Sequence, residues 1–220
     1  MSLPLKRTLG EMRAELQTRL GFGMSGQAGI VNSPIMGSFL RSAQEQLYAQ
    51  FDWRELCVSE EVLTGADQAL YDYPADCNVE RIKTINVMDG GWWRPLTEGI
   101  TVEQRSFPAG DQPMRYQRGE QVEVWPVPNG QYRLRFDYVK TLDSFTDSDD
   151  RTSIPSEPVF LFALAQAKAH YRSPDADRYE KQMDALLLRL KAQHRGQSVW
   201  TKDTPCDTRA LKDKFYDYPR

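Results

Sequence analysis

The sequence predicts an α+β protein, an antiparallel bundle of about four helices with an inserted antiparallel β domain and an extended C-terminal arm. Apolar residues recur at helical spacing before Trp53 and after Ile154, whereas the middle of the chain is rich in β-branched and aromatic residues broken by Gly, Pro, Asn and Asp. Because short amphipathic helices are unstable alone, the helices from both ends are expected to pack together.

Four parts follow from this pattern. Residues 1–54 are predicted to form the N-terminal half of the bundle, residues 55–152 the inserted β domain, residues 153–196 the C-terminal half, and residues 197–220 the arm. A chain of 220 residues can bury a sizeable core, and 40% hydrophobic with 27% charged residues is ordinary for a folded globular protein.

The first helix is predicted from a capping box. Thr8 can cap the helix, Glu11 can close the box, and Gly21 is placed to end it. The apolar stripe of this helix consists of Leu9, Met12, Leu16 and Leu20.

A glycine-rich loop over residues 21–29 is expected next. Ser33 and Pro34, a cap and a first-position proline, then predict the start of the second helix. Its apolar side consists of Met36, Leu40, Ala43, Leu47 and Phe51.

Two further helices are predicted after the β domain. Ser156 is expected to cap the segment "VFLFALAQAKAHY", which is apolar nearly all round and should be the most buried helix. Ser173 and Pro174 predict the start of the last helix, which Gly196 ends. The stripe of this last helix consists of Tyr179, Met183, Leu186, Leu187 and Leu190.

The clearest strand is "YRLRFDY", residues 132–138, in which apolar and charged residues alternate. Its expected partner is "QVEVW", residues 121–125, joined to it through a turn at Asn129 and Gly130. The apolar faces of the two strands match only if the loop is odd-numbered or bulged, which Pro126 and Pro128 favour.

Two adjacent tryptophans follow a second turn signal. The strand "VERIKTINVM" is expected to pair with "WWRPL", and a two-residue turn at Asp89–Gly90 or at Gly90–Gly91 places Trp92 on the face of the apolar strand residues. Trp93 then lies on the opposite face, and only an odd-numbered loop reverses this. Trp92 is therefore predicted to be core, and Trp93 to be available to a partner.

The sequence excludes several classes of protein. It holds no run of about 18 apolar residues, and its N-terminus lacks the pattern of a secretory signal, so we expect a protein that does not span a membrane and stays in the cytoplasm where it is made. The net charge is −3 without a basic cluster, which argues against tight binding of DNA. Cys57, Cys77 and Cys206 are too far apart to indicate a CxxC metal site or a disulfide framework.

No residue pattern indicates catalysis. His170 and His194 have no carboxylate or cysteine at ligand spacing, and the sequence contains none of the common nucleotide-binding, hydrolase or metalloprotease motifs. The acidic residues 143–150 lack the glycine and the closing glutamate of a calcium loop. We therefore expect no enzyme, no cofactor and no metal.

The last segment, residues 197–220, is the predicted arm. It follows Gly196 and carries acidic and basic residues in nearly equal number. Such a segment cannot offset its ordering entropy alone, so we expect it to order on assembly against another protein. The partner-binding residues predicted here are Trp200, Phe215, Tyr216 and Tyr218, in addition to Trp93.

Several stretches together resemble a family of phage proteins. They read "LRSAQEQLYAQFDWREL", "LYDYPADCNVERIKTINVMDGGWWRPLTEGI", "GEQVEVWPVPNGQYRLRFDY" and "IPSEPVFLFALAQAKAHYRSPDA". In sequence and in the order of elements, over roughly residues 5–195, the chain is similar to the head-to-tail adaptor (connector, or head completion) proteins of tailed bacteriophages, especially short-tailed phages.

The resemblance implies a structural virion protein. It implies a ring, commonly twelvefold, that sits beneath the portal and joins it to the tail, with the portal protein, a tail or nozzle protein and further copies of the chain as partners. DNA would pass through the ring without specific binding, and the protein would lie in the neck or tail of the virion after assembly in the host cytoplasm.

An alternative from another class is a carbohydrate- or protein-binding component of a tail fibre or baseplate, which would use exposed tryptophans such as Trp93 and Trp125. A third reading, a hydrolase, needs a carboxylate pair that the sequence does not indicate.

Overall fold

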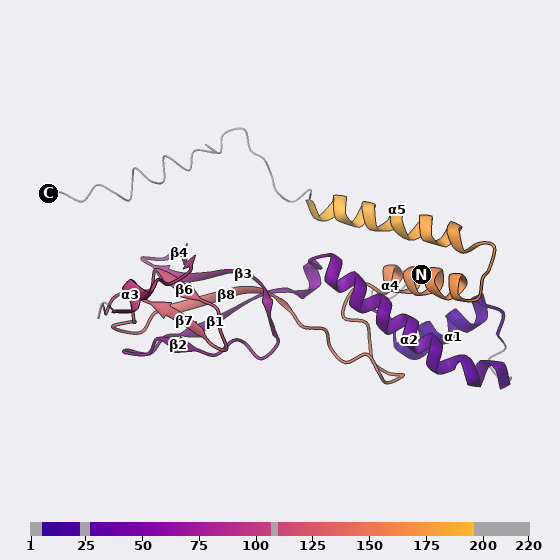
Figure 1. Cartoon of the computed structure of the whole chain (residues 1–220), viewed down its shortest axis with the longest axis horizontal. Helices are drawn as coiled ribbons and strands as arrows, with labels where there is room; N and C mark the ends of the chain where they lie inside the picture. The colour runs from indigo at the N-terminus through magenta and orange to yellow at the C-terminus, as the bar shows by residue number, and fades with distance from the viewer. Residues whose placement is uncertain (1–5, 23–26, 107–109, 196–220) are drawn as a thin grey trace. The chain divides into compact units, whose positions relative to one another are not determined.

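The computed structural model describes residues 6–22, 27–106 and 110–195, without the side chains of residues 27–32 and 193–195. The described chain divides into two units, the first ending at Met183 and the second beginning at Asp184, where Asp184–Arg195 is helical. The described helices and strands, most of which Figure 1 labels, are α1 (Leu9–Arg19), α2 (Gln27–Gln50), the 3-10 turn Arg54–Leu56, β1 (Cys57–Leu63), β2 (Leu70–Tyr71), β3 (Cys77–Asp89), β4 (Trp92–Pro95), β5 (Thr97–Glu98), α3 (Val102–Ser106), β6 (Arg115–Gln117), β7 (Val122–Trp125), β8 (Arg133–Lys140), α4 (Ser156–His170) and α5 (Ala176–Arg195).

The predicted α+β class is confirmed. The strands follow α2 and precede α4 in the chain, and α1, α2 and α4 pack on one another, so helices from both ends of the chain share one core. The domain limits after residues 54 and 152 remain predictions, and the arm, residues 197–220, lies outside the described residues. None of the described helices is both long and apolar enough to span a bilayer.

Helix α1 begins and ends as its sequence predicts. The Thr8 side chain accepts a hydrogen bond from the Glu11 amide at 3.2 Å, and the Glu11 carboxylate accepts one from the Thr8 amide at 3.0 Å. Gly21 follows the helix with a φ of +80°, which glycine adopts without strain. Of the predicted stripe, Leu9, Met12 and Leu16 are fully buried.

The predicted start of the second helix is wrong. Helix α2 begins at Gln27, so Ser33 does not cap it and Pro34 lies inside it. A proline within a helix removes one amide donor, which disfavours the helix but does not prevent it from continuing on both sides. Downstream, Met36, Leu40 and Leu47 are buried as predicted.

The two later helices are present as predicted, but the predicted capping residues of both, Ser156 and Ser173, are wrong. Helix α4 begins at Ser156 itself, with Pro155 in the capping position, and is largely buried as predicted. Helix α5 begins at Ala176, because Ser173 and the residues after it form a turn in which the Ala176 amide donates to the Ser173 carbonyl at 3.2 Å.

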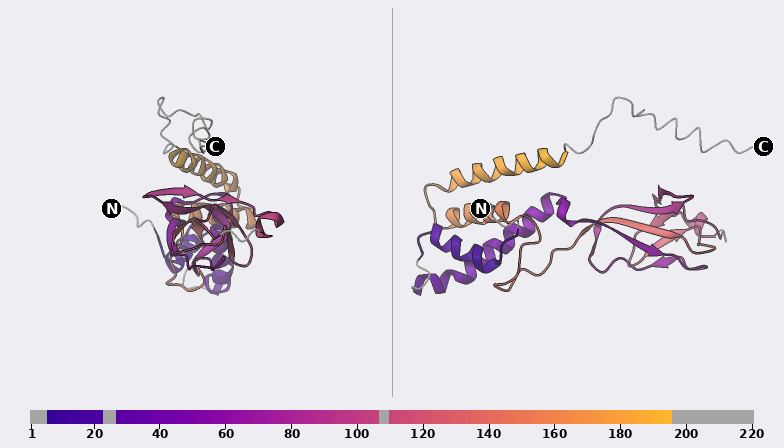
Figure 2. Two further views of the ribbon diagram at one scale, coloured as in Figure 1. Left: turned by 90° about the vertical axis from the view of Figure 1, so that its left-hand side faces the viewer. Right: turned by 180° about the vertical axis from the view of Figure 1, so that it is seen from behind.

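The strands form two four-stranded sheets in the orders β1-β8-β3-β4 and β2-β7-β6-β5. All pairs are antiparallel except the parallel pair β5–β6. Figure 2 shows the strands from two further sides. The buried faces of the two sheets share one core, which contains Tyr71, Ile82, Ile85, Val87, Leu96, Tyr116, Val122, Val124, Leu134, Phe136 and Tyr138.

The predicted pairing of the strand at residues 121–125 with the strand at residues 132–138 is wrong. β7 pairs with β2 and β6, whereas β8 pairs with β1 and β3 in the other sheet. The segment between them is held elsewhere: the Pro128 carbonyl accepts from the Asp67 amide at 2.9 Å, and the Gly130 carbonyl accepts from the Thr64 hydroxyl at 3.1 Å. This segment therefore carries the chain from one sheet to the other.

The two-residue turn before the tryptophans is confirmed. Asp89 pairs with Trp92 and Met88 with Trp93, which leaves Gly90 and Gly91 as the turn, with φ values of +53° and +91°. The predicted burial of Trp92 is wrong, because its side chain is 80% exposed. The ladder between β3 and β8 ends at the pair Val87–Leu134, so the end of the hairpin extends past its neighbour strand.

Replacing Thr8 by Ala removes the hydroxyl that accepts from the Glu11 amide. We expect this variant to lose about 1 kcal/mol of unfolding free energy, the usual cost of losing a helix cap. Urea unfolding of the two proteins measures the difference. Thr8→Ser, which keeps the hydroxyl, should behave like the original chain, and equal losses in both variants would contradict the capping role.

Candidate functional site

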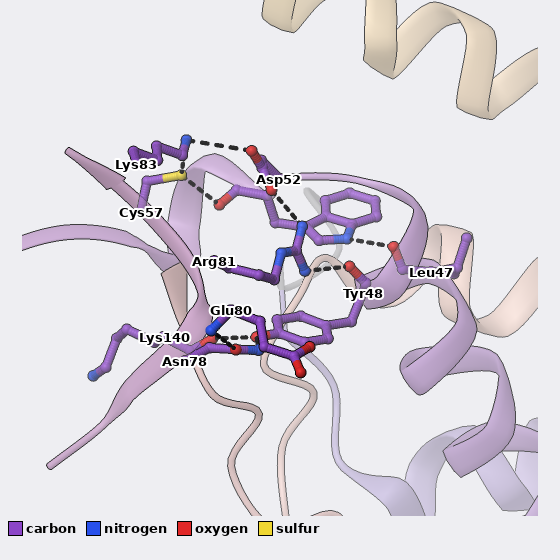
Figure 3. Close-up of polar contacts among 10 residues, drawn as sticks. Leu47, Tyr48, Asp52, Cys57, Asn78, Glu80, Arg81, Lys83 and Lys140 are labelled. Carbon is purple, nitrogen blue, oxygen red and sulfur yellow. Dashed lines mark hydrogen bonds and ion pairs between the residues drawn. The ribbon is translucent and has the colours of Figure 1, made fainter. Parts of the chain in front are cut away.

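The end of α2 is joined to the first sheet by Arg81 of β3 (Figure 3). Its guanidinium donates to the Tyr48 carbonyl at 2.6 Å, forms an ion pair with Asp52, and lies over the Tyr48 ring at 4.5 Å. Carbonyls in the last turn of a helix have no partner within the helix. Arg81 therefore satisfies one of these groups from the sheet.

Tyr48 is held by the sheet as well. Its hydroxyl donates to the Lys140 carbonyl of β8 at 2.9 Å and accepts from the Asn78 amide of β3 at 2.8 Å. One side chain near the end of α2 thus contacts two neighbouring strands. This fixes where β3 and β8 meet the helix.

Trp53 continues the junction. The residue is fully buried, and its indole nitrogen donates to the Leu47 carbonyl at 3.0 Å, another group in the last turn of α2. The Cys57 thiol donates to the Trp53 carbonyl at 3.3 Å and accepts from the Lys83 ammonium at 3.0 Å. These contacts order the chain where it passes from helix to strand.

A second polar cluster lies between β1, β3 and β8. The Tyr138 hydroxyl contacts the carboxylates of Asp76 and Glu60, and the Lys140 ammonium lies 2.8 Å from Asp76. The hydrogen bonds from Lys140 and Tyr138 lower the pKa of Asp76. Burial, together with the nearby carboxylates of Asp76 and Glu60, raises the pKa of the Cys77 thiol to about 11, so this cysteine is protonated at neutral pH.

The described residues contain no group of three His, Cys, Asp or Glu side chains that could hold a metal ion. His170, one of the two histidines of the chain, packs among aromatic rings. Its ring centre lies 5.5 Å from that of Phe39 and 5.0 Å from that of Tyr171. The Asp150 carboxylate accepts hydrogen bonds from the amides of Thr146 and Asp147, both at 2.8 Å, which is the geometry of a capped turn.

Exposed apolar side chains gather on the β part of the chain. Five of the seven large hydrophobic residues that are exposed in the described part of the chain lie there. They are Leu63, Leu70, Trp92, Val102 and Met114. Tryptophans and neighbouring apolar residues of this kind often dominate the energy of protein contacts, so this part of the molecule is the candidate interaction surface.

Trp93, the predicted partner contact, is half-buried and occupied by its own chain. The guanidinium of Arg135 lies 4.5 Å from its ring centre and that of Arg133 lies 5.8 Å away. Beside it, the Asp137 carboxylate accepts from the Thr84 hydroxyl at 2.9 Å and from the Asn86 amide at 2.7 Å. Trp93 thus covers a polar network on the outer face of the first sheet.

Sequence reasoning missed Trp92 as the exposed tryptophan. The length of the strand before the turn at Gly90 could have indicated this exposure. That strand is much longer than the alternating segment of residues 132–138. The other predicted contacts, Trp200, Phe215, Tyr216 and Tyr218, lie outside the described residues.

The exposed apolar side chains of the strands are typical of proteins that contact other proteins. Residues 7–206 match the family model described as SU10 adaptor protein, and the chain belongs to that family. This confirms the resemblance to phage head-to-tail adaptors and identifies a virion component of a non-enzymatic kind. No curated protein matches the chain.

Replacing Asp76 by Asn tests the cluster through its pH dependence. Because the pKa of Asp76 is lowered in the folded protein from the ordinary value of 3.8, its ion pair stabilises the fold above that pH and is lost as the pH falls through the lowered value. Asp76→Asn should therefore be less stable than the original chain at pH 7, and the difference should shrink below about pH 4.

Thermal melts of both proteins between pH 7 and pH 2 measure this. Asp149→Asn, which removes one exposed carboxylate from the loop before α4, is the matched control. A difference between the Asp76 variant and the original chain that stays constant with pH would contradict the ion pair.

The two tryptophans should respond differently to truncation. Trp93→Ala removes the ring that Arg133 and Arg135 contact, so we expect a loss of about 1 kcal/mol or more of unfolding free energy. Trp92→Ala removes an 80% exposed side chain and should change that free energy by less than about 0.5 kcal/mol. Denaturant unfolding of both variants decides, and a larger loss for Trp92→Ala would refute this assignment.

Proposed function

We propose that this protein is the head-to-tail adaptor of a tailed phage, and that copies of it form a ring beneath the portal and join it to the tail. Membership of the adaptor family supports an assembly role. The observation that carries the proposal is the set of exposed apolar side chains on the β part, of which Trp92 is the most exposed. A twelvefold ring is what the resemblance to phage adaptors implies.

The junction supports the same function. Arg81 and Tyr48 connect α2 to β3 and β8 through hydrogen bonds, an ion pair and a ring contact. A protein that bridges two assemblies has to hold its binding surfaces on a firm frame. These contacts supply one for the helices and the strands.

The proposed ring would serve as a conduit for DNA without specific binding. The net charge of the chain is −3, and its sequence contains no basic cluster. Strong phosphate binding depends on clustered Lys and Arg residues and would hinder passage of the duplex. We propose the portal protein, a tail or nozzle protein and further copies of the chain as the partners, in the neck or tail of the virion, after assembly in the host cytoplasm.

The alternative function, a sugar- or protein-binding tail-fibre or baseplate component, uses a tryptophan platform. Sugar stacking needs an open indole face. Arg135 lies over the Trp93 ring, and the Trp125 indole donates to the Gln104 carbonyl at 2.7 Å. Trp92 offers an open ring, so glycan-dependent quenching of its fluorescence would favour this alternative.

Electron microscopy of the purified protein mixed with its portal tests the proposal. We expect rings of the adaptor attached to the portal on one face. The alternative would be favoured by two results together. Portal particles would show no added density even at protein concentrations far above those needed for assembly, and a glycan would quench the tryptophan fluorescence.

The predicted arm gives a second test. We propose that residues 197–220 contact the portal or a neighbouring copy through Trp200, Phe215, Tyr216 and Tyr218. Deleting this segment should leave the melting temperature unchanged and abolish portal binding, measured by co-sedimentation. A full-length variant with Ser at these four positions controls for arm length and should show the same loss. Undiminished binding by both variants would refute the arm.

A further inference from the structure

Cys57 and Lys83 are in contact although they lie on different strands. The Lys83 ammonium donates to the Cys57 sulfur at 3.0 Å and lies 3.6 Å from the Asp52 carboxylate, and Figure 3 shows its nitrogen joined to both. Cys57 is the first residue of β1, whereas Lys83 lies within β3, and β8 separates these two strands in the sheet. The long lysine side chain therefore brings a primary amine to a thiol across an intervening strand.

The pair is open to small reagents. Cys57 is half-buried, and the Lys83 side chain is 42% exposed. A neighbouring cation favours the thiolate form of a cysteine, which is the form that oxidants attack. Cys77, the other cysteine in the described part of the chain, differs in this respect, because burial and the carboxylates of Asp76 and Glu60 raise the pKa of its thiol to about 11. Of these two thiols, Cys57 is therefore the one suited to react.

We propose that Cys57 and Lys83 form a modification site, at which a peroxide oxidises the thiol and the lysine amine then forms a covalent sulfur–nitrogen bond with it. A cysteine sulfenic acid condenses with a nitrogen to give a sulfenamide. Groups held in contact within one molecule react far faster than the same groups free in solution. The 3.0 Å contact provides this proximity before any oxidant arrives.

The reaction has two steps. In the first, the Cys57 sulfur attacks one oxygen of hydrogen peroxide, the O–O bond breaks, and the products are a sulfenic acid and water. The sulfur loses two electrons in this step, and the peroxide gains them. In the second, the neutral Lys83 amine attacks the sulfur, the S–O bond breaks, and the oxygen leaves as water with one proton from the amine. The chain then contains an S–N bond and has lost two hydrogen atoms.

The second step depends on pH. Burial lowers the pKa of Lys83, but the contacts of this side chain with Cys57 and Asp52 outweigh that effect and raise the pKa above its ordinary value of 10.5. The side chain is therefore an ammonium at neutral pH and must lose a proton before it can attack. Linking should consequently be faster at pH 9 than at pH 7.

The link would fasten the start of β1 to the middle of β3. Cys57 and Lys83 are 26 positions apart, and with β8 between them the two strands share no pairing. A covalent bond that closes such a stretch stabilises the fold mainly by restricting the unfolded chain. The cytoplasm keeps thiols reduced, whereas virion surfaces are oxidising surroundings. In a virion component the link would therefore strengthen the region beside the junction of α2 and β3.

Peroxide treatment of the full chain, followed by digestion and mass spectrometry, tests the proposal. All proteins carry Cys206→Ser, which removes a competing thiol. We expect the peptide with Cys57 to be joined to the peptide with Lys83, at the summed mass less two hydrogen atoms, and to separate on addition of dithiothreitol. The linked protein should melt about 5 °C or more above the reduced one.

Two lysine variants separate the reactive amine from the charge. Lys83→Arg keeps the cation without the primary amine, so its Cys57 should stop at the sulfenic acid, which dimedone labels. Lys140→Arg changes the lysine that pairs with Cys77, and as the matched control it should link like the original chain. Thermal melts of the reduced proteins check that each variant is folded.

The proposal would be overturned by a Cys57 thiol that resists peroxide, or by one that dimedone labels equally in the original chain and in Lys83→Arg. A bond from Cys57 to any residue other than Lys83 would have the same meaning. A rate of linking that does not rise with pH would show that the amine is not the attacking group. A linked protein that melts like the reduced one would contradict the stabilising role of the link.

Discussion

The carbonyl groups at the end of α2 impose the constraint on which the arrangement of helices and strands depends. The last carbonyls of a helix need donors from outside it, and an unpaired buried carbonyl is costly. Arg81 reaches the Tyr48 carbonyl from β3, and the buried indole of Trp53 reaches the Leu47 carbonyl. The connection from helix to sheet is therefore made of hydrogen bonds that the helix itself requires, so the strands cannot separate from the helices without leaving these groups unpaired.

The unequal lengths of β3 and β8 and the two faces of the hairpin determine which of the two tryptophans is exposed. β3 runs from Cys77 to Asp89, whereas β8 begins only at Arg133, opposite the last part of β3. The turn at Gly90 and Gly91 therefore lies beyond the part of β3 that pairs with β8, and Trp92, which pairs with Asp89, lies past the end of that ladder. Trp93, one residue further, faces the opposite side of the hairpin, where the two arginines of β8 contact its ring. The two adjacent residues of β4 thus differ in burial because their side chains face opposite sides of the hairpin, and only the side of Trp93 has arginines of β8 against it.

The features that the sequence predicted correctly are those that depend on residues close to one another in the chain. The capping box at Thr8 and the two-residue turn before Trp92 depend on residues within a few positions, and both are confirmed. The pairing of β8 depends on which distant segment reaches it, and here the nearest strand, β7, belongs to the other sheet. The Arg81 junction was not predictable for the same reason, since Arg81 and Tyr48 are 33 positions apart and neither has an unusual local pattern.

The division between core and surface residues has a consequence for assembly. The β core contains residues such as Phe136 and Leu134, which are fully buried, and on its outer face the Asp137 carboxylate accepts hydrogen bonds from Thr84 and Asn86. The exposed apolar residues of the strands, such as Leu63 and Trp92, contribute little to this core. Their chemistry can therefore be adapted to a partner with small effects on folding. In a protein whose work is to contact others, this separation lets the contact surfaces change while the helices, the sheets and the junction that joins them stay the same.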